Sequence, residues 1–254
     1  MKILSLEGKK ALVIGASNVI GRAIAVALGE AGADVAVATT TRSKHEETIV
    51  NSCSNELWAL DRKTFALSID AADEGAVDDL AQRTIDELGG LSVLVNAQDL
   101  PYAQAAGDVD IEDYRRVIDV NLVGPFVACR AASAHMLNTG GSIINVASVL
   151  GERGMAHGAG YCSAQAGVLN LTRALALEWA REGIRVNAIG AGWTEGMGIL
   201  ADEASTQQLE RYLPYKRLAQ PQEIAGIAVY LASDASAYLT GQVVWIDGGA
   251  LSHV

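Results

Sequence analysis

The strongest constraint on the fold is a regular alternation of short apolar segments with longer amphipathic ones. Segments rich in Val, Ile and Leu predict seven strands, at residues 10–15, 34–39, 65–69, 92–96, 142–147, 185–189 and 242–246. Stretches with helical periodicity lie between them, among them residues 22–31, 74–88, 111–132, 164–181 and 222–232. Strands that are apolar throughout belong in a sheet covered on both faces, and β-helix-β alternation makes that sheet parallel. The pattern therefore predicts an α/β fold, a doubly wound seven-stranded parallel sheet with helices on both faces.

The same pattern predicts one domain over residues 1–254. This length suits one large α/β domain, and no repeat or Pro/Ser-rich linker interrupts it. In such Rossmann folds, ligands bind beyond the carboxyl ends of the strands. Residues 190–214 are polar and glycine-containing, lie between a strand and a helix, and predict a lid over a pocket.

Composition excludes several classes of partner. The formal charge of -11 and the pI near 4.8 argue against nucleic acid, which attracts basic surfaces. No apolar run reaches the roughly 18 to 20 residues that a membrane span needs. The chain has three cysteines, Cys53, Cys129 and Cys162, which are widely spaced and form no CxxC pair. This odd number and wide spacing predict free thiols in a reducing cytoplasm and no metal site.

A glycine-containing loop follows the first predicted strand. It runs from Gly15 through Ser17, Asn18 and Ile20 to Gly21, where a helix begins. Glycines at such a turn let the backbone approach a pyrophosphate, whose charge a helix N-terminus favours. By itself the loop is also compatible with a tight turn and close helix-sheet packing.

Together with motifs farther along the chain, this loop resembles the TGxxxGxG loop of the short-chain dehydrogenase/reductase family. Gly15 and Gly21 match its first and last glycines, whereas Ile14 replaces the threonine and Val19 the middle glycine. A β-branched side chain at Val19 is disfavoured if the backbone there needs a positive φ, and it would crowd the pyrophosphate.

The resemblance extends over the whole chain. Asp70 matches the family's acidic residue near the adenine, and Asn121, in VNLVG, matches the asparagine that props a helix and organises the proton-relay water. Ser148 lies thirteen residues before Tyr161, the family's spacing for a serine that polarises a carbonyl and a tyrosine that donates the proton. The C-terminal YLTGQVVWIDGG is similar to the family's last strand and turn.

The resemblance implies a complete cofactor and catalytic site. The implied cofactor-binding residues are Gly15, Ser17, Asn18, Ile20, Gly21, Thr40, Thr41, Arg42, Asp70, Asn96, Tyr161, Gln165, Gly192 and Thr194, and the implied catalytic residues are Ser148, Tyr161, Asn121 and Gln165.

The sequence departs from the family pattern in two further turns, after the fourth and the sixth predicted strands. The NNAG turn reads Asn96-Ala97-Gln98-Asp99, which keeps only the first asparagine, and the proline-glycine after the sixth strand reads Ala191-Gly192.

The largest departure is Gln165, which replaces the lysine of YxxxK. Four residues make about one helical turn, so position 165 lies beside Tyr161. A unit charge about 4 Å away at an effective dielectric near 20 is worth roughly 4 kcal/mol, or about three pKa units. Glutamine supplies no such charge, although its amide can hydrogen-bond ribose hydroxyls. We therefore expect the pKa of Tyr161 near its ordinary value of about 10, which favours reduction, with Tyr161 as a neutral acid, over oxidation.

The second predicted strand ends in Ala38-Thr39-Thr40-Thr41-Arg42. An NAD site usually has an acid there to accept from the ribose 2′-OH, whereas basic or hydroxyl residues suit a 2′-phosphate. The sequence therefore predicts NADP(H) rather than NAD(H), unless Arg42 points into water. Arg153 and His157, between the serine and the tyrosine, are expected to be solvated loop residues.

Three functions stay open at this point. The first is a cytoplasmic reductase that converts a ketone or 3-oxoacyl-type carbonyl into an alcohol, assembled as a homodimer or homotetramer through the helices at 111–132 and 164–181. The second is a catalytically impaired binding or assembly subunit, which the changes at Val19, Ala97 and Gln165 favour. The third is a cofactor-independent lyase similar to halohydrin dehalogenases, which share the serine-tyrosine spacing.

Overall fold

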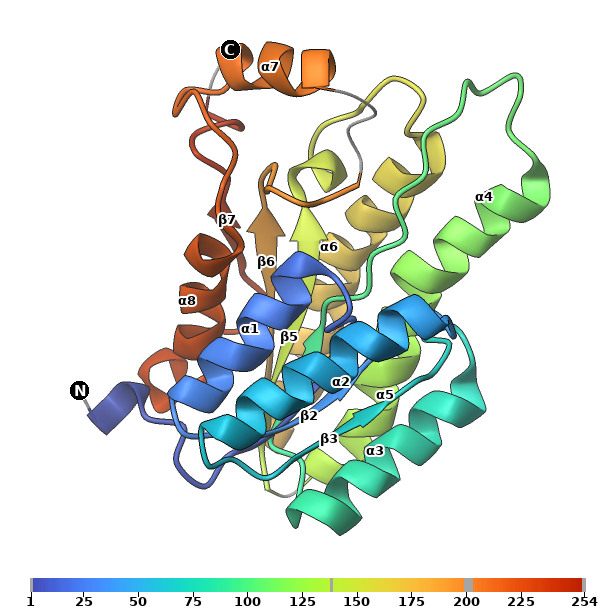
Figure 1. Cartoon of the computed structure of the whole chain (residues 1–254). Coiled ribbons are helices and arrows are strands. Elements are labelled where there is room, and N and C mark those ends of the chain that lie inside the picture. The colour runs from blue at the N-terminus through green and yellow to red at the C-terminus, as the bar shows by residue number, and fades with distance from the viewer. Residues whose placement is uncertain (1, 138, 199–202, 253–254) are drawn as a thin grey trace.

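The computed structural model describes residues 2–137, 139–198 and 203–252, and it confirms the predicted fold (Figure 1). The strands are β1 (Lys10–Ile14), β2 (Asp34–Ala38), β3 (Thr64–Leu67), β4 (Val93–Asn96), β5 (Gly141–Ser148), β6 (Ile184–Ala191) and β7 (Val243–Ile246). They form one seven-stranded sheet in the order β3-β2-β1-β4-β5-β6-β7, and every neighbouring pair is parallel.

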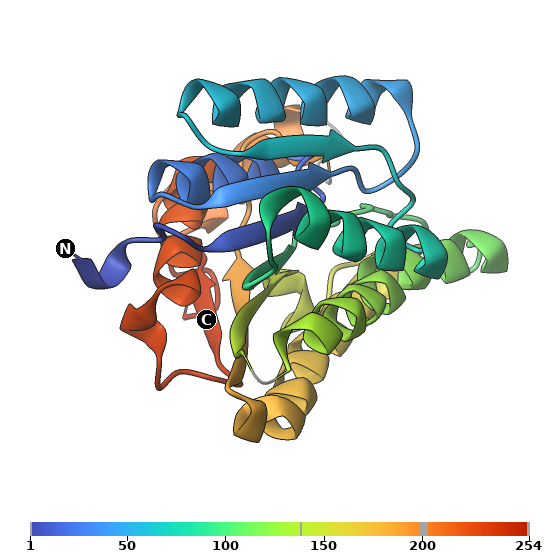
Figure 2. The ribbon, with the colours of Figure 1, turned by 90° about the horizontal axis from the view of Figure 1, so that it is seen from below.

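Helices cover both faces of this sheet. They are α1 (Val19–Glu30), α2 (Lys44–Ala59), α3 (Glu74–Leu88), α4 (Ile111–Ile118), α5 (Gly124–Met136), α6 (Ala159–Trp179), α7 (Glu203–Tyr212) and α8 (Pro221–Ala232). Figure 2 shows the sheet between the layer of α1, α2 and α8 and the layer of α3, α5 and α6. Several helices begin at side chains that accept from the first turn, such as Ser43 for α2 and Asp73 for α3.

The core consists of two apolar layers separated by the sheet. Along β1, Ala11 and Val13 pack on the side of α1, α2 and α8, whereas Leu12 and Ile14 pack on the side of α3 and α5. This alternation is what period-2 side-chain geometry requires of a strand buried on both faces. The three cysteines are free, as predicted. Burial raises the pKa of the Cys129 thiol to about 12, so it behaves as a core residue.

The long helix predicted at 111–132 is interrupted by a π-helical turn, η2 (Asp119–Val123), between α4 and α5. Such turns insert an extra residue into a helix and are frequent at functional sites. The helical stretch Ile111–Met136 is long and apolar enough to cross a membrane by length and composition alone. More than half of its most apolar window is buried inside the protein, as in a core helix.

The crevice of the fold opens where β1 and β4 lie side by side, because the chain leaves these strands toward opposite edges of the sheet. Gly15, after β1, has a φ of +87°, and a Cβ atom there would lie 2.4 Å from the backbone of Ala97, after β4. Only glycine permits this approach. The two loops are therefore in direct contact.

The first turn of α1 depends on a second close approach. A Cβ atom on Gly21 would lie 2.2 Å from the backbone oxygen of Gly15, whereas one on Gly226, in α8, would meet nothing within 4 Å. We expect Gly21→Ala to lower the free energy of unfolding by about 1–3 kcal/mol, because backbone must move. The matched Gly226→Ala should raise it by about 0.5–1 kcal/mol through helix propensity. Urea unfolding followed by circular dichroism measures both, and equal shifts in one direction would contradict this account.

Candidate active site

The structure brings the predicted catalytic residues together beyond the carboxyl end of β5. Ser148 ends β5, Tyr161 lies in the first turn of α6, and Gln165 follows one turn later. All three line a cavity of about 20 Å³ together with the loops after β1 and β4 and with Met197. That space suits about one water molecule.

The side chain of Gln165 hydrogen-bonds the backbone of Ser148 and carries no charge that could act on Tyr161. Its side chain is buried, and its Oε1 accepts a hydrogen bond of 3.0 Å from the backbone N–H of Ser148. The Ser148 hydroxyl accepts from Leu150 N at 3.1 Å, and Ser148 lines the same cavity as Tyr161. Gln165 therefore fixes the end of β5, and with it the position of Ser148.

The partner of Tyr161 is a carboxyl group that the sequence analysis did not assign to the site. The Tyr161 side chain is 1% exposed, and its hydroxyl donates a hydrogen bond of 2.7 Å to Oδ1 of Asp99. Asp99 is partly exposed as a residue, but burial of its carboxyl group raises its pKa, while the hydrogen bond from Tyr161 lowers it in part.

The expected pKa of Tyr161 near 10 is wrong. Burial raises the pKa of Tyr161 well above 10, and the negative charge and hydrogen bond of Asp99 raise it further. Ser148 acts to lower the pKa of Tyr161, but by less. Tyr161 is therefore a neutral phenol at neutral pH.

Asn121 holds the loop that carries Asp99. It lies in η2, is 1% exposed, and its Oδ1 accepts from Leu100 N at 2.8 Å while its Nδ2 donates to Leu100 O at 2.9 Å. Leu100 follows Asp99 in the chain. The two bonds therefore fix the backbone from which the Asp99 carboxylate reaches Tyr161.

Asn96 belongs to a network beneath this cavity. Its Nδ2 donates to Asn145 Oδ1 at 2.8 Å, and Asn145 Nδ2 donates to Thr172 Oγ1 at 2.9 Å. All three side chains are buried, and Asn96 is not among the residues that line the cavity. Its position supports β4 and β5 from inside, so direct contact between its side chain and a cofactor stays a prediction.

The loop after β1 is set for an anion at the start of α1. Asn18 accepts from Gly21 N at 2.9 Å and donates to Ala97 O at 2.6 Å, so it caps the helix and joins the two loops. The backbone amides of Val19 and Ile20 keep no acceptor among the described residues. The φ of Val19 is not positive, and its side chain lies against Gly196. The concern about backbone strain at Val19 is thus wrong.

An acid does stand near the end of β2, supplied by α2 rather than by the strand. The Glu46 carboxylate accepts from Ser17 Oγ at 2.5 Å, from Thr40 N at 2.7 Å and from Thr41 N at 3.1 Å, and it also accepts from the Thr41 hydroxyl. Burial acts to raise the pKa of Glu46, but these hydrogen bonds more than offset it and hold the pKa below its ordinary value.

The sequence analysis did not identify Glu46, because it predicted no helix over Lys44–Ala59. The Ser43-x-x-Glu46 spacing, typical of a helix start, was the available signal.

The remaining predicted cofactor residues lie around this edge. Arg42 is exposed, and its guanidinium makes no hydrogen bond or ion pair within the described part of the chain. Asp70 accepts from Arg116 at 2.7 Å and from Ala72 N at 3.0 Å. Thr194 is buried and donates to Gly192 O at 3.1 Å, which shapes the turn after β6.

These residues fit a dinucleotide at three points. The loop after β1 is a glycine cradle with free helix amides, the Glu46 carboxylate can accept from ribose hydroxyls, and Gln98 carries a buried amide that has no hydrogen-bond partner. An unpartnered buried amide is costly unless a ligand or water satisfies it. A nicotinamide ring needs more room than the cavity of about 20 Å³, and Met197 is its most adaptable lining side chain.

The predicted lid follows β6 and includes α7, and its residues 199–202 lie outside the described residues. Arg153 was expected to be a solvated loop residue, and this expectation is wrong because its guanidinium binds α7 and the C-terminal segment. It donates to Ala250 O at 2.9 Å and to the Tyr212 hydroxyl at 2.7 Å. His157 is exposed, as expected, and its neighbour in the same loop, Glu152, is exposed as well.

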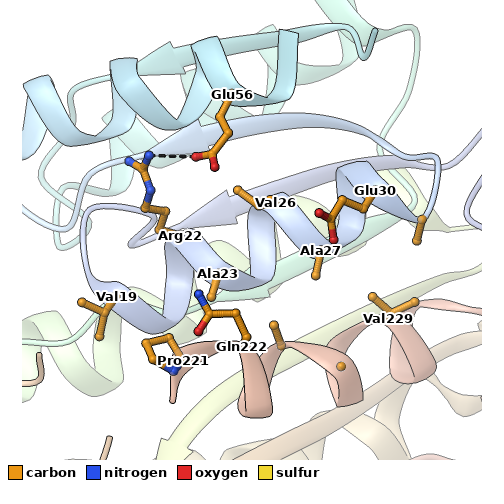
Figure 3. Close-up of a pocket in the computed structure, with 13 residues that line it drawn as sticks. Val19, Arg22, Ala23, Val26, Ala27, Glu30, Glu56, Pro221, Gln222 and Val229 are labelled. Carbon is orange, nitrogen blue, oxygen red and sulfur yellow. Dashed lines mark hydrogen bonds and ion pairs between the residues drawn. The ribbon is translucent and has the colours of Figure 1, made fainter. Parts of the chain in front are cut away.

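A wide groove of about 850 Å³ lies elsewhere, on the outer surface between α1 and α8 (Figure 3). Small apolar side chains such as Ala23 and Ala27 line it, and Arg22 at its rim forms an ion pair of 2.7 Å with Glu56. It contains none of the predicted site residues. No cluster of three or more His, Cys, Asp or Glu side chains that could hold a metal is found in residues 2–137, 139–198 and 203–252.

Comparisons with known proteins match nearly the whole chain. A family model described as enoyl-(acyl carrier protein) reductase matches residues 15–251. A 3-oxoacyl-(acyl-carrier-protein) reductase from Synechocystis sp. is 35% identical over 247 residues, which cover 96% of this chain and 98% of that protein.

Two solved structures are similar over nearly the whole chain. A short-chain type dehydrogenase/reductase from Mycobacterium marinum has a TM-score of 0.90 and 34% identity over 98% of both chains. A gluconate 5-dehydrogenase from Burkholderia cenocepacia J2315, in complex with NADP and tartrate, has a TM-score of 0.90 and 28% identity over 99% of this chain and 98% of that one.

The Asn121 clamp can be tested by unfolding. We expect Asn121→Ala to lower the free energy of unfolding by about 1–3 kcal/mol, because it leaves the Leu100 amide and carbonyl without partners. Gln82→Ala is the control, since Gln82 makes one exposed bond of 3.0 Å to Asp86, and it should change stability by about 0.5 kcal/mol or less. Urea titrations compare the two, and similar losses would show that the clamp stabilises no more than a surface bond.

Proposed function

Since the chain belongs to the short-chain dehydrogenase/reductase family of oxidoreductases, we propose that it uses a nicotinamide nucleotide to reduce a ketone or 3-oxoacyl-type carbonyl to an alcohol. The bound nucleotide supplies the hydride. The residues of this chain polarise the carbonyl and deliver the proton. The observation that carries the proposal is the cavity at the carboxyl end of the sheet, which Ser148 lines together with a neutral, buried Tyr161.

Each residue has a stated role in this reaction. The Ser148 hydroxyl polarises the carbonyl oxygen, and Tyr161 gives that oxygen its proton. Gln165 orients Ser148 through the bond of 3.0 Å to its backbone. Asn121 keeps the loop after β4 in place through Leu100. The loop from Gly15 to Gly21 would hold the pyrophosphate at the start of α1.

The high pKa of Tyr161 favours reduction over oxidation. A phenol above its ordinary pKa range keeps its proton at neutral pH, so it can act as an acid but provides almost no phenolate to act as a base. A lyase of the halohydrin dehalogenase kind needs the phenolate as a base and is disfavoured for the same reason. Loss of turnover with intact nucleotide binding would favour the impaired-subunit hypothesis instead.

Assembly into a homo-oligomer is part of the proposal. Val123 at the end of η2 and Phe126 in α5 are 40% and 41% exposed, and Leu177 in α6 is 83% exposed. Large apolar side chains gathered on exposed helix faces are typical of contacts between subunits. We propose a dimer or tetramer joined through these helices, acting in the cytoplasm, with residues 190–214 as a lid over the substrate.

Turnover tests the central proposal. Purified protein with NADPH or NADH should reduce at least one ketone or 3-oxoacyl thioester. The reaction is measured by the loss of the absorbance of the reduced nicotinamide. Tyr161→Phe and Ser148→Ala should each lower kcat by about 10²–10⁴-fold. Tyr238→Phe, at a fully exposed position, should leave it unchanged. A chain that binds nucleotide but reduces none of a broad carbonyl panel, or a Tyr161→Phe variant of full activity, would overturn the reductase proposal.

Arg42 and Glu46 set the choice of nucleotide in opposite directions. The Arg42 guanidinium can attract a 2′-phosphate, so we propose NADP(H), whereas the Glu46 carboxylate repels that phosphate and takes donors that would otherwise bind it. We expect Glu46→Gln to increase the ratio of NADPH to NADH affinity about tenfold, and Arg42→Ala to lower it by a similar factor.

Fluorescence titrations of both nucleotides measure these ratios. Glu47→Gln is the matched control for Glu46→Gln, because Glu47 is the exposed neighbour in the same turn of α2. Unchanged ratios in both site variants would place the 2′-position of the nucleotide elsewhere.

A further inference from the structure

We propose that Asp99 is the proton partner of Tyr161. Asp99 returns a proton to Tyr161 during carbonyl reduction and takes a proton from Tyr161 during alcohol oxidation. The inference rests on the proposed function and extends it. It assigns to the loop after β4 a task that Gln165 cannot perform.

Tyr161 and Asp99 form a short directed chain at the cavity that Ser148 also lines. The Tyr161 hydroxyl donates to Asp99 Oδ1 at 2.7 Å. A carboxylate at the end of such a chain can only accept, whereas a carboxylic acid can donate back into it. The protonation state of Asp99 therefore sets the direction in which the chain can pass a proton.

No cation competes for this carboxylate among the described residues that line the cavity. The titratable groups that act on Tyr161 are Asp99 and Cys162, and the one that acts on Asp99 is Tyr161. The other lining side chains are uncharged, including Asn18 from the loop after β1, Gln165 from α6 and Met197 after β6. Asp99 is therefore the carboxyl group that acts on Tyr161, and Cys162 adds a smaller effect.

The position of Asp99 is fixed by the fold. Asn121 holds the backbone of Leu100 with bonds of 2.8 and 2.9 Å, and Asn18 holds the carbonyl of Ala97 at 2.6 Å. Both sides of Asp99 are therefore anchored within a few residues. A carboxylate held in this way keeps its distance to Tyr161 when substrate enters.

The steps balance in both directions. A bound reduced nucleotide would supply the hydride to the carbonyl carbon. The O–H bond of Tyr161 breaks as a new O–H bond forms on the substrate oxygen, and the O–H bond of Asp99 breaks as Tyr161 regains its proton. Asp99 is left as a carboxylate and takes a proton from solvent before the next turnover. In oxidation each proton transfer runs backward, and a bound oxidised nucleotide would take up the hydride.

The sign of the pH dependence follows from which form of Asp99 each direction uses. Burial raises the pKa of Asp99 above its ordinary range, so the acid form persists to higher pH than in an exposed aspartate. Reduction uses the acid form, so its kcat should fall as pH rises through the pKa of Asp99. Oxidation uses the carboxylate, so its kcat should rise over the same interval.

Asp99→Asn tests this pairing because an amide keeps the size of the carboxyl group but cannot exchange a proton. We expect kcat for reduction to fall about 10- to 100-fold. The limb of the pH profile that belongs to Asp99 should disappear. Asp113→Asn is the matched control, since exposed Asp113 accepts from the Tyr102 hydroxyl at 3.4 Å, and its profile should match the wild type. A variant at Asp99 with wild-type kcat and an unchanged pH profile would overturn the proposal.

A second readout needs neither nucleotide nor substrate. The ultraviolet absorbance of phenolate, taken as the difference between a protein and its Tyr161→Phe counterpart, follows the ionisation of Tyr161 alone. Because Asp99→Asn removes a neighbouring negative charge, it should lower the pKa of Tyr161. An unchanged or higher pKa would show that the two groups are not coupled. If the wild type reduces no carbonyl, the proposed function fails, while this titration still decides whether Asp99 is the partner of Tyr161.

Discussion

The site depends on the close approach of the loops that follow β1 and β4. Gly15 makes it possible, because any side chain there would overlap the backbone of Ala97. Contact between the loops lets Asn18 bridge them and brings residue 99 over the first turn of α6. Because both faces of this parallel sheet are buried against apolar helix faces, the loops beyond the strand ends are where polar side chains can meet one another and a ligand. The architecture therefore creates the crevice, and the residues after β4 decide its charge.

A similar contact between distant segments lies at Glu46, at the edge of the proposed nucleotide site. This residue occupies the third position of α2, from which a capping glutamate would turn back to the backbone of Ser43. It reaches instead across to Ser17, Thr40 and Thr41, whose donors would otherwise face the crevice. A side chain of the protein thus satisfies donors that suit an anion, and an incoming phosphate has to compete with it.

Much of this arrangement could be predicted from the sequence. Apolar runs predicted all seven strands. Spaced motifs identified Ser148, Tyr161 and Gln165, which line one cavity, and Asn121, which holds the neighbouring loop. Asp99 and Glu46 could not be assigned in this way, because their roles arise from contacts between segments far apart in the chain. Asp99 accepts a hydrogen bond from a tyrosine 62 residues later in the chain. Glu46, in the first turn of α2, accepts one from Ser17, in the loop that precedes α1. Periodicity reports which face of an element is buried, but not which loop side chain crosses to the next loop.

The exchange of lysine for glutamine gains its meaning from Asp99. A cation beside a tyrosine stabilises the phenolate, whereas an anion destabilises it, so the substitution and the new neighbour shift the pKa of Tyr161 in the same direction. Loss of the lysine alone would leave a weak base. Loss of the lysine together with the gain of a buried aspartate produces a tyrosine that holds its proton, beside a carboxyl group that can return a proton when it is in its acid form. The two departures from the family pattern are therefore one change in electrostatics, and Gln165, freed from carrying charge, serves to hold Ser148.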